Sequence, residues 1–279
     1  MRKILLYLFI SVLQLPIAFA QQGAAAESPK ALKILAIGNS FSEDALENYL
    51  YDLALAADKK IIIGNLYIGG ASLALHVKNT QQNKASYSYR KVPENGIKVT
   101  TPDVSIAEAL ADEDWDFISF QQASSASGQW ATIAKDLPEL LRYVRTLVPA
   151  HTQFVYHQTW AYQQDSPHEG FNNYQRSQLN MYKQIMETTK KISRWKEFSF
   201  VVPVGTAIQN ARTSTLGDHF TRDGYHLNLD YGRFTAACTW YEKIFRKNVV
   251  GNSYLPDGMT EEERLAAQES AHAAVRKPL

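Results

Sequence analysis

The sequence contains a single cysteine, Cys238, so no disulfide can form within one chain. Small exported domains often rely on disulfides, whereas this chain must be stabilised by its apolar core even in an oxidising compartment. Cys238 lies in an apolar stretch with helical spacing, where cysteine behaves as a small hydrophobic residue. We therefore expect a buried structural thiol rather than a catalytic one.

The chain also lacks an excess of charge of either sign. Its 29 Lys and Arg residues are balanced by 28 Asp and Glu residues. Nucleic-acid binding depends on a surplus of positive side chains that neutralise phosphates. The composition therefore gives no reason to expect a nucleic acid as partner.

Metal signatures are lacking as well. Metal-binding histidines usually occur in short paired spacings, and no such spacing is found at His76, His151, His168, His219 or His272. No segment resembles a calcium-binding loop. We therefore expect neither a metal nor another cofactor.

Long apolar runs are lacking apart from residues 4–18, which follow two basic residues. This run is shorter than a membrane-spanning helix, and polar residues follow it at once. Residues 18–20 have the small-x-small pattern that signal peptidases cleave. The sequence thus predicts a signal peptide over residues 1–20, cleavage before Gln21, and export to the periplasm or the medium with no stable membrane anchor.

Residues 21–279 alternate strand-like and helix-like segments, without an internal repeat or a linker. Such alternation is typical of a parallel sheet covered by helices on both faces. We therefore expect one domain, an α/β fold in the form of a three-layer α/β/α sandwich with a mostly parallel five-stranded sheet. Ligands of such sheets bind beyond the carboxyl ends of the strands. The loops at those ends are residues 38–43, 69–72, 121–131, 157–173 and 205–226.

Three other segments have their own patterns. Aromatic and β-branched residues on both sides of an Asn-Gly turn predict a β-hairpin insertion around residues 79–103. Polar, alanine-rich residues 261–274 predict a C-terminal helix. Apolar residues at helical spacing predict a helix over residues 44–57, and Glu43 and Asp44 suit its positive end.

The first loop places Ser40 between a strand and a helix. Its hydroxyl could cap the helix by accepting a hydrogen bond from a backbone N–H. It could instead be a nucleophile whose own N–H stabilises an oxyanion. A third interpretation, a phosphate-cradling turn, is disfavoured because the loop lacks the extra glycines and the lysine of a P-loop.

The last loop favours the nucleophile. Asp223 and His226 are three residues apart, with Gly224 between them to let the chain fold back. Asp223 could accept a hydrogen bond from His226 Nδ1, which would fix the tautomer and leave Nε2 facing a serine. A lone D-x-x-H also occurs in surface turns, but this one follows the last strand and would meet Ser40 at the same sheet edge.

These blocks resemble the SGNH (GDSL-type) serine hydrolase superfamily. Its first block, G-D/N-S-x-S/T after the first strand, matches residues 38–42. Its second block, a glycine after the second strand, matches residues 69–70, and its last block, D-x-x-H before the final helix, matches residues 223–226. The likeness spans residues 33–245, and residues 157–162 resemble an exported branch of the superfamily.

The resemblance implies a flavodoxin-like SGNH hydrolase fold and an oxyanion hole. Its donors would be the N–H groups of Ser40 and Gly70 and a side-chain amide. The superfamily usually supplies that amide from G-x-N-D after the third strand, where this chain has Gln121 and Gln122 instead. A glutamine amide can donate the same hydrogen bond. Gln122 aligns best with the glutamine of carbohydrate-esterase branches, and Gln121 is the alternative.

Aromatic residues on the same loops are candidate substrate contacts. Trp130, Trp160 and Tyr162 could stack on sugar rings, or they could pack the loops against the core. His157 could contact the substrate or make a structural hydrogen bond. Both interpretations of each residue stay open at this point.

The resemblance implies an exported serine esterase that acts through a Ser40–His226–Asp223 triad and an acyl-enzyme. Export, near-neutral charge and polar, aromatic loops favour small acyl esters of carbohydrates, acetyl esters above all. The alternatives are a non-catalytic glycan-binding module and an acyltransferase, since one triad serves both hydrolysis and transfer. No site loop is strongly apolar, which disfavours a lipase.

Overall fold

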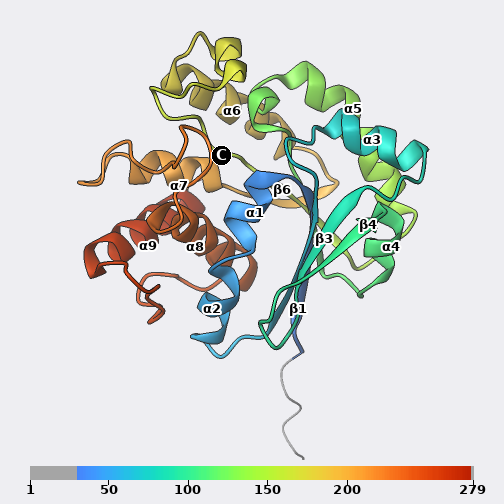
Figure 1. The fold of residues 1–279 in the computed structure, drawn as a ribbon, viewed down its shortest axis with the longest axis horizontal. Coiled ribbons are helices and arrows are strands. Elements are labelled where there is room, and N and C mark those ends of the chain that lie inside the picture. The colour runs from blue at the N-terminus through green and yellow to red at the C-terminus, as the bar shows by residue number, and fades with distance from the viewer. Residues whose placement is uncertain (1–29, 278–279) are drawn as a thin grey trace, which may run out of the picture.

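The computed structural model describes residues 30–277, which contain one seven-stranded sheet between two layers of helices (Figure 1). Five strands are parallel, in the order β2-β1-β5-β6-β7. Their bounds are Leu32–Gly38 (β1), Ile61–Tyr67 (β2), Phe117–Phe120 (β5), Gln153–His157 (β6) and Phe198–Val202 (β7). This order is that of flavodoxin-like sheets, so the expected α/β/α fold is confirmed.

The expectation of five strands was wrong, because the hairpin joins the sheet. Strands β3 (Tyr87–Val92) and β4 (Val99–Val104) are antiparallel, and β3 pairs with β2. Tyr87 and Tyr89 of β3 are buried, so this strand has a core-facing side like the parallel strands. The outer strand β4 is largely exposed and contains Pro102, which suits the edge of a sheet.

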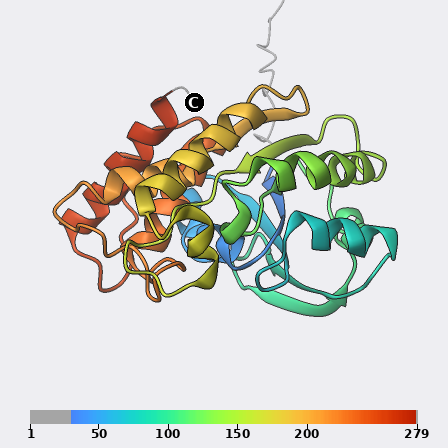
Figure 2. The same cartoon turned by 90° about the horizontal axis from the view of Figure 1, so that it is seen from above.

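Helices cover both faces of the sheet (Figure 2). The α-helices are Ser40–Leu46 (α1), Leu50–Leu55 (α2), Leu73–Gln81 (α3), Ile106–Ala111 (α4), Trp130–Arg145 (α5), Gln178–Ile192 (α6), Val204–Ala211 (α7), Tyr231–Phe245 (α8) and Glu261–Arg276 (α9). Short 3₁₀ helices span Ser124–Ala126 (η1) and Glu169–Tyr174 (η2).

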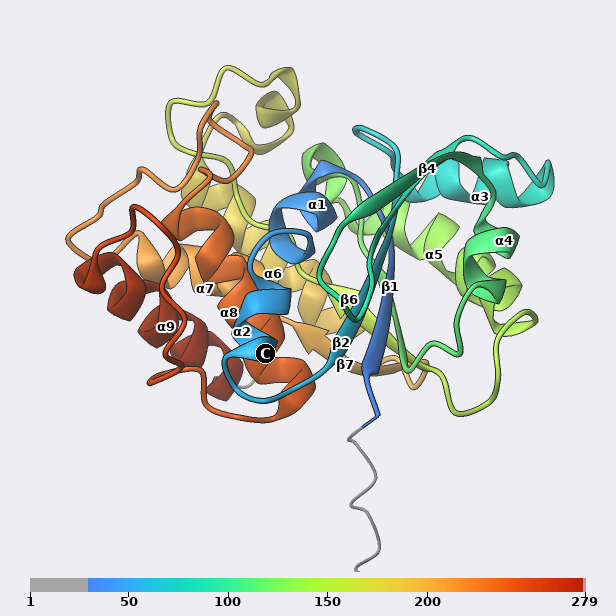
Figure 3. The same ribbon diagram turned by 60° about the horizontal axis from the view of Figure 1, so that its bottom comes forward.

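The two layers form separate apolar cores. Side chains of β1 alternate between them: Ile34 and Ala36 face one core, and Leu35 and Ile37 face the other. The first core is covered by α1, α2, α7, α8 and α9, and the second by α3, α4 and α5, while α6 contributes to both (Figure 3). Cys238 lies buried in α8, as expected.

The helix expected over residues 44–57 begins earlier and is interrupted. It begins at Ser40 because Asn39 Oδ1 accepts the Phe41 N–H at 2.9 Å. Asn48 ends α1 by donating its side-chain amide to the Glu43 carbonyl oxygen at 3.2 Å. The chain therefore forms two short helices, α1 and α2, where the apolar spacing alone indicates one.

Helix α7 occupies the first part of the loop expected over residues 205–226. Its first N–H groups find an acceptor in the loop after β6: Gly205 N–H donates to the Gln158 carbonyl at 3.0 Å, and Thr206 N–H to Gln158 Oε1 at 2.9 Å. A partner so distant in sequence satisfies the unpaired donors of the helix end. The residues around α7 do not indicate this contact with Gln158, so the sequence did not predict the helix.

Among residues 30–277, no helix combines the length and the apolar character needed to cross a bilayer. The signal peptide expected over residues 1–20 lies outside the described residues.

Candidate active site

Ser40 stands at the turn between β1 and α1. Gly38 ends the strand, and a Cβ added there would lie 2.2 Å from Ser42 Oγ, so a side chain does not fit. Asn39 caps α1, so the cap role considered for Ser40 belongs to its neighbour. Ser40 is the first helical residue, and its N–H has no acceptor among residues 30–277.

The last loop is a tight turn that presents His226. Thr221 and Leu227 pair in an antiparallel bridge, and the Arg222 N–H donates to the His226 carbonyl at 2.9 Å. Gly224 has φ +90°, and a Cβ added to it would lie 2.8 Å from Ser166 Cα. The turn therefore requires glycine, both for its backbone conformation and for its contact with the neighbouring loop.

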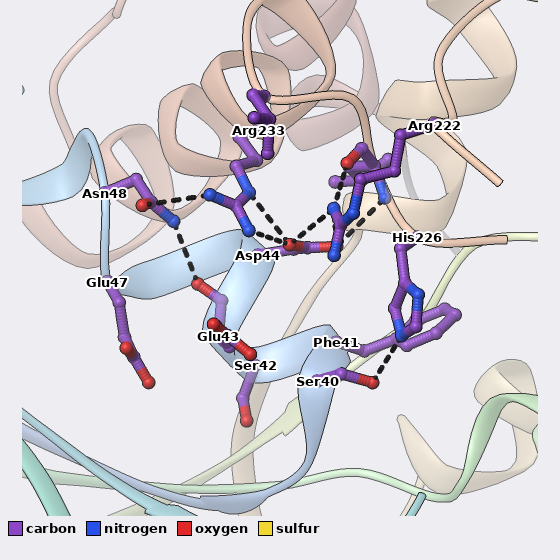
Figure 4. Close-up of polar contacts among 12 residues, drawn as sticks. Ser40, Phe41, Ser42, Glu43, Asp44, Glu47, Asn48, Arg222, His226 and Arg233 are labelled. Carbon is purple, nitrogen blue, oxygen red and sulfur yellow. Dashed lines mark hydrogen bonds and ion pairs between the residues drawn. The ribbon is translucent and has the colours of Figure 1, made fainter. Parts of the chain in front are cut away.

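Ser40, His226 and Asp223 form one chain of hydrogen bonds. Ser40 Oγ lies 2.8 Å from His226 Nε2 (Figure 4), and His226 Nδ1 lies 2.7 Å from Asp223 Oδ2. The other carboxylate oxygen accepts the N–H groups of His226 at 2.8 Å and of Tyr225 at 3.2 Å. The structure thus brings together the serine, histidine and aspartate singled out in the sequence.

The electrostatic environment of Asp223 keeps it ionised. Partial burial acts to raise the pKa of this carboxyl, but hydrogen bonds from the His226 imidazole and from two backbone N–H groups outweigh it and lower the pKa below its ordinary value. A carboxylate can only accept hydrogen bonds, so His226 Nδ1 is the donor. Neutral His226 therefore presents the lone pair of Nε2 to the Ser40 hydroxyl.

Asp44 ties α1 to this turn. Its buried carboxylate pairs with Arg233 at 2.7 Å and with Arg222 at 3.1 Å (Figure 4), and it also accepts the Leu227 N–H at 2.9 Å. Burial raises the pKa of Asp44, and the two guanidinium groups oppose that rise. Since Arg222 and Leu227 flank the turn, the carboxylate fixes both of its ends to the helix that begins at Ser40.

This network was missed in the sequence, where Asp44 was assigned only to the helix end. One signal was present: a residue four positions after a helical serine lies one turn further along the same face. The partner Arg233 on α8 had no such signal, because it lies 189 residues away.

Trp160 and Tyr162 are fully buried, so direct stacking on a sugar ring is ruled out for both. The Trp160 ring stacks on Phe41 with centroids 4.1 Å apart, and its Nε1 donates to the Tyr225 carbonyl at 2.7 Å. The Tyr162 hydroxyl lies 2.8 Å from Ser124 Oγ. Both aromatic side chains support the site loops from beneath, which is the packing role left open by the sequence.

Trp130 also has a packing role, on the other face of the sheet. Its ring meets that of Trp195 edge-on at 5.7 Å, and Lys191 Nζ lies 5.0 Å from its centroid. It packs against the second apolar core, whereas Phe41, beside the serine, belongs to the first. The contacts of Trp130 thus do not include the Ser40 site.

Gln122 holds two helices in place. Its Oε1 accepts the N–H groups of Leu73 at 3.0 Å and of Ala123 at 2.9 Å, and its Nε2 donates to Thr132 Oγ1 at 3.0 Å. Leu73 begins α3, and Thr132 lies in the first turn of α5. The amide of Gln122 is therefore engaged away from the serine.

Gln121 faces the serine loop instead. Its Nε2 donates to Asn39 Oδ1 at 2.7 Å, and its Oε1 accepts from His157 Nδ1 at 2.8 Å. His157 is fully buried, and burial lowers its pKa to about 3, so it is a neutral structural donor with no surface for substrate. Asn39 Nδ2 also donates to the Ala71 carbonyl, next to Gly70. The loops after β1, β2 and β5 thus meet at one asparagine.

Metal-binding side chains do not gather at this edge of the sheet. Within residues 30–277, no group of three or more His, Cys, Asp or Glu residues has the arrangement of a metal site. The hydrogen-bond partner of Ser40 Oγ within the described residues is the imidazole of His226.

Replacing Asp44 with Asn should destabilise the protein. Asparagine can still accept the Leu227 N–H, but it leaves two guanidinium groups without their counter-charge. Removing one partner of a buried ion pair typically costs about 3–5 kcal/mol. Urea denaturation would measure the loss against Asp103→Asn, an exposed position at the sheet edge where a change within about 0.5 kcal/mol is expected. Equal, small losses in the two variants would contradict the role assigned to Asp44.

Comparison with known proteins places the chain in a family. Residues 33–274 match the domain of unknown function DUF4886. A crystal structure of a DUF4886 family protein from Bacteroides uniformis is similar, with 48% identity, a TM-score of 0.87, and coverage of 88% of this chain and 95% of the other. No curated protein matches the sequence.

A less similar solved structure shares the fold. A proposed SGNH hydrolase from Slackia heliotrinireducens is 21% identical, with a TM-score of 0.52 over 76% of this chain and 98% of the other. At this identity the likeness concerns the fold alone. The chain is therefore a member of the DUF4886 family with the α/β/α fold of SGNH hydrolases.

Proposed function

We propose that this protein is a serine esterase in which Ser40 is the nucleophile. The observation that supports this most directly is the 2.8 Å contact between Ser40 Oγ and His226 Nε2, within a chain that ends at Asp223. A serine with a structural role alone needs no imidazole oriented by a carboxylate. A hydroxyl, a base and an orienting acid in this order are the parts of nucleophilic acyl transfer.

The mechanism follows from the positions of the protons. Ser40 Oγ attacks the ester carbonyl while its proton passes to His226 Nε2, and Asp223 stabilises the imidazolium that forms. The imidazolium then gives this proton to the alcohol oxygen as the C–O bond breaks, which leaves an acyl-enzyme. Water, deprotonated by the same Nε2, hydrolyses the acyl-enzyme and restores the serine.

The oxyanion would be held by donors from three loops. The N–H groups of Ser40 and Gly70 have no acceptor among residues 30–277, so both are open to a ligand. We assign the third donor to Gln121 in place of Gln122. One N–H of the Gln121 amide is used by Asn39, and the second has no acceptor within the described residues. Donors fixed before the reaction stabilise the developing charge without reorganisation.

The substrates we propose are small acyl esters, acetyl esters above all, of carbohydrates. This rests on the polar and aromatic character of the loops around the serine. Ser40 and Tyr225 are partly exposed, and His226 retains 19% of its side-chain surface. A partly exposed tyrosine ring among polar groups suits a sugar better than a long acyl chain.

We also propose that the protein is exported after removal of a signal peptide. The mature protein should begin at Gln21, because the pattern at residues 18–20 fits signal peptidase. Expression with the full leader, followed by N-terminal sequencing of the mature product, would test this. Material that retains Met1 would contradict the localisation and leave the esterase proposal untouched.

The two glutamines offer a matched pair of variants. Gln121→Ala should lower kcat by roughly tenfold to a thousandfold, more than it raises KM, because an oxyanion donor acts mainly in the transition state. Gln122→Ala should instead lower stability, since it removes the acceptor for two N–H groups. Steady-state kinetics and thermal melting of both variants provide the test. A kcat loss confined to Gln122→Ala would reverse the assignment.

Ser40→Ala should abolish hydrolysis of a short activated ester such as 4-nitrophenyl acetate. The loss of a triad nucleophile can lower kcat about a millionfold. Stability should change little, because Asn39 and not Ser40 caps the helix. The control is Ser177→Ala, which removes the cap of α6 and should lose about 1 kcal/mol of stability while keeping activity.

Asp223→Asn should lower kcat less than Ser40→Ala, because it disturbs the orientation of His226 but leaves both reacting groups.

Wild-type protein that turns over no short acyl ester and resists a fluorophosphonate probe would favour the glycan-binding alternative. Transfer of the acetyl group to an added sugar in preference to water would favour the acyltransferase.

A further inference from the structure

His168 and Tyr225 extend the catalytic residues into a continuous aromatic wall. The Tyr225 ring lies 4.2 Å from the His226 ring, and the His168 ring meets Tyr225 edge-on at 4.7 Å, both measured between centroids. The positive form of His226 also contributes to the lowered pKa of His168, after the larger effect of burial. His168 is thus a second imidazole close to the reacting one, although it lies 58 positions earlier in the chain.

The tautomer of neutral His168 is set by the backbone N–H of Gly170. The Gly170 N–H donates to His168 Nδ1 at 2.9 Å, so Nδ1 is an acceptor and the proton of the neutral ring is on Nε2. Among residues 30–277 that Nε2–H has no hydrogen-bond partner, and it is not one of the enclosed polar atoms. His168 therefore presents one oriented N–H donor to solvent.

The wall is held rigidly. Gln163 N–H donates to the Gly224 carbonyl at 2.8 Å, which joins the loop of His168 to the turn of His226. Buried Tyr162 lies beneath both rings, with centroids 4.9 Å from His168 and 5.7 Å from Tyr225. The two loops also lie side by side in the ribbon (Figure 2). The N–H donor of His168 therefore keeps a fixed position relative to His226.

The chemistry of the reaction says which part of an ester meets this wall. His226 must deliver its proton to the alcohol oxygen, so the alcohol leaves on the side of the imidazole. The proposed oxyanion donors at Ser40 and Gly70 belong to other loops, those after β1 and β2. Tyr225 and His168, which continue from the His226 imidazole, therefore border the alcohol rather than the acyl group.

We propose that Tyr225 and His168 form the subsite for the alcohol part of the ester, and that this part is a sugar ring. The inference rests on the esterase function proposed above. Tyr225 is partly exposed, and the C–H groups of a pyranose can pack against its aromatic ring. The His168 Nε2–H donates to a hydroxyl or ring oxygen of the same sugar. A simple alkyl or aryl alcohol has no acceptor for that donor.

The test compares two acetyl esters in wild-type protein and in His168→Asn. Asparagine can still accept the Gly170 N–H but does not reach as far as Nε2. The measured quantity is kcat/KM for an acetylated methyl pyranoside divided by kcat/KM for phenyl acetate, whose alcohol part has no further hydrogen-bond acceptor. We expect this ratio to fall about five- to tenfold, the effect of one hydrogen bond. Thermal melting would verify that the variant is folded.

The control is His151→Asn, an exposed histidine just before β6, where the ratio should equal that of wild type. A ratio in His168→Asn within about twofold of wild type would overturn the subsite while leaving the esterase intact. Wild-type protein inactive on both esters would instead overturn the esterase proposal itself. The two failures are therefore distinguishable in one set of measurements.

Discussion

The Asp44 carboxylate is buried between α1 and the turn that carries His226, and the geometry of the site depends on it. Taking a charge out of water costs several kcal/mol unless partners replace the lost hydration. Here Arg222, Arg233 and the Leu227 N–H do so together. Each partner comes from a different part of the last loop or from α8, so the same contacts that satisfy the charge also set the position of the imidazole.

Much of the site could be predicted from the sequence because its chemistry is encoded locally. A glycine before Ser40 and the three-residue spacing of Asp223 and His226 are properties of short turns, and the alternation of strands brings such turns to one sheet edge. The pairing of Asp44 with Arg233 could not be predicted in this way, since it depends on how α8 packs against α1. The choice between Gln121 and Gln122 could not be made from the sequence either. Adjacent residues that leave a strand point in opposite directions, so a shift of one position in the alignment changes which amide faces the serine.

Aromatic residues show a second limit of sequence reasoning. Trp160 and Tyr162 lie on the expected site loop, yet both are buried, and the ring that borders His226 is Tyr225. Composition places an aromatic residue on a loop but does not say which of its faces meets solvent. The buried rings still contribute to the proposed site, because Trp160 Nε1 donates to the Tyr225 carbonyl and Tyr162 packs against His168. The packing of the buried rings thus decides which of the more exposed rings can meet a ligand.

Asn39 shows how one side chain can serve folding and chemistry together. Its Oδ1 accepts the Phe41 N–H, which begins α1, and the Gln121 amide, which orients a donor toward the serine loop. Its Nδ2 donates to the Ala71 carbonyl and so fixes the loop of Gly70. Aspartate at this position would lose the last bond, because a carboxylate has no N–H to give. The asparagine in the first motif is therefore matched to a glutamine after β5: each amide needs the other to bring three loops to one point.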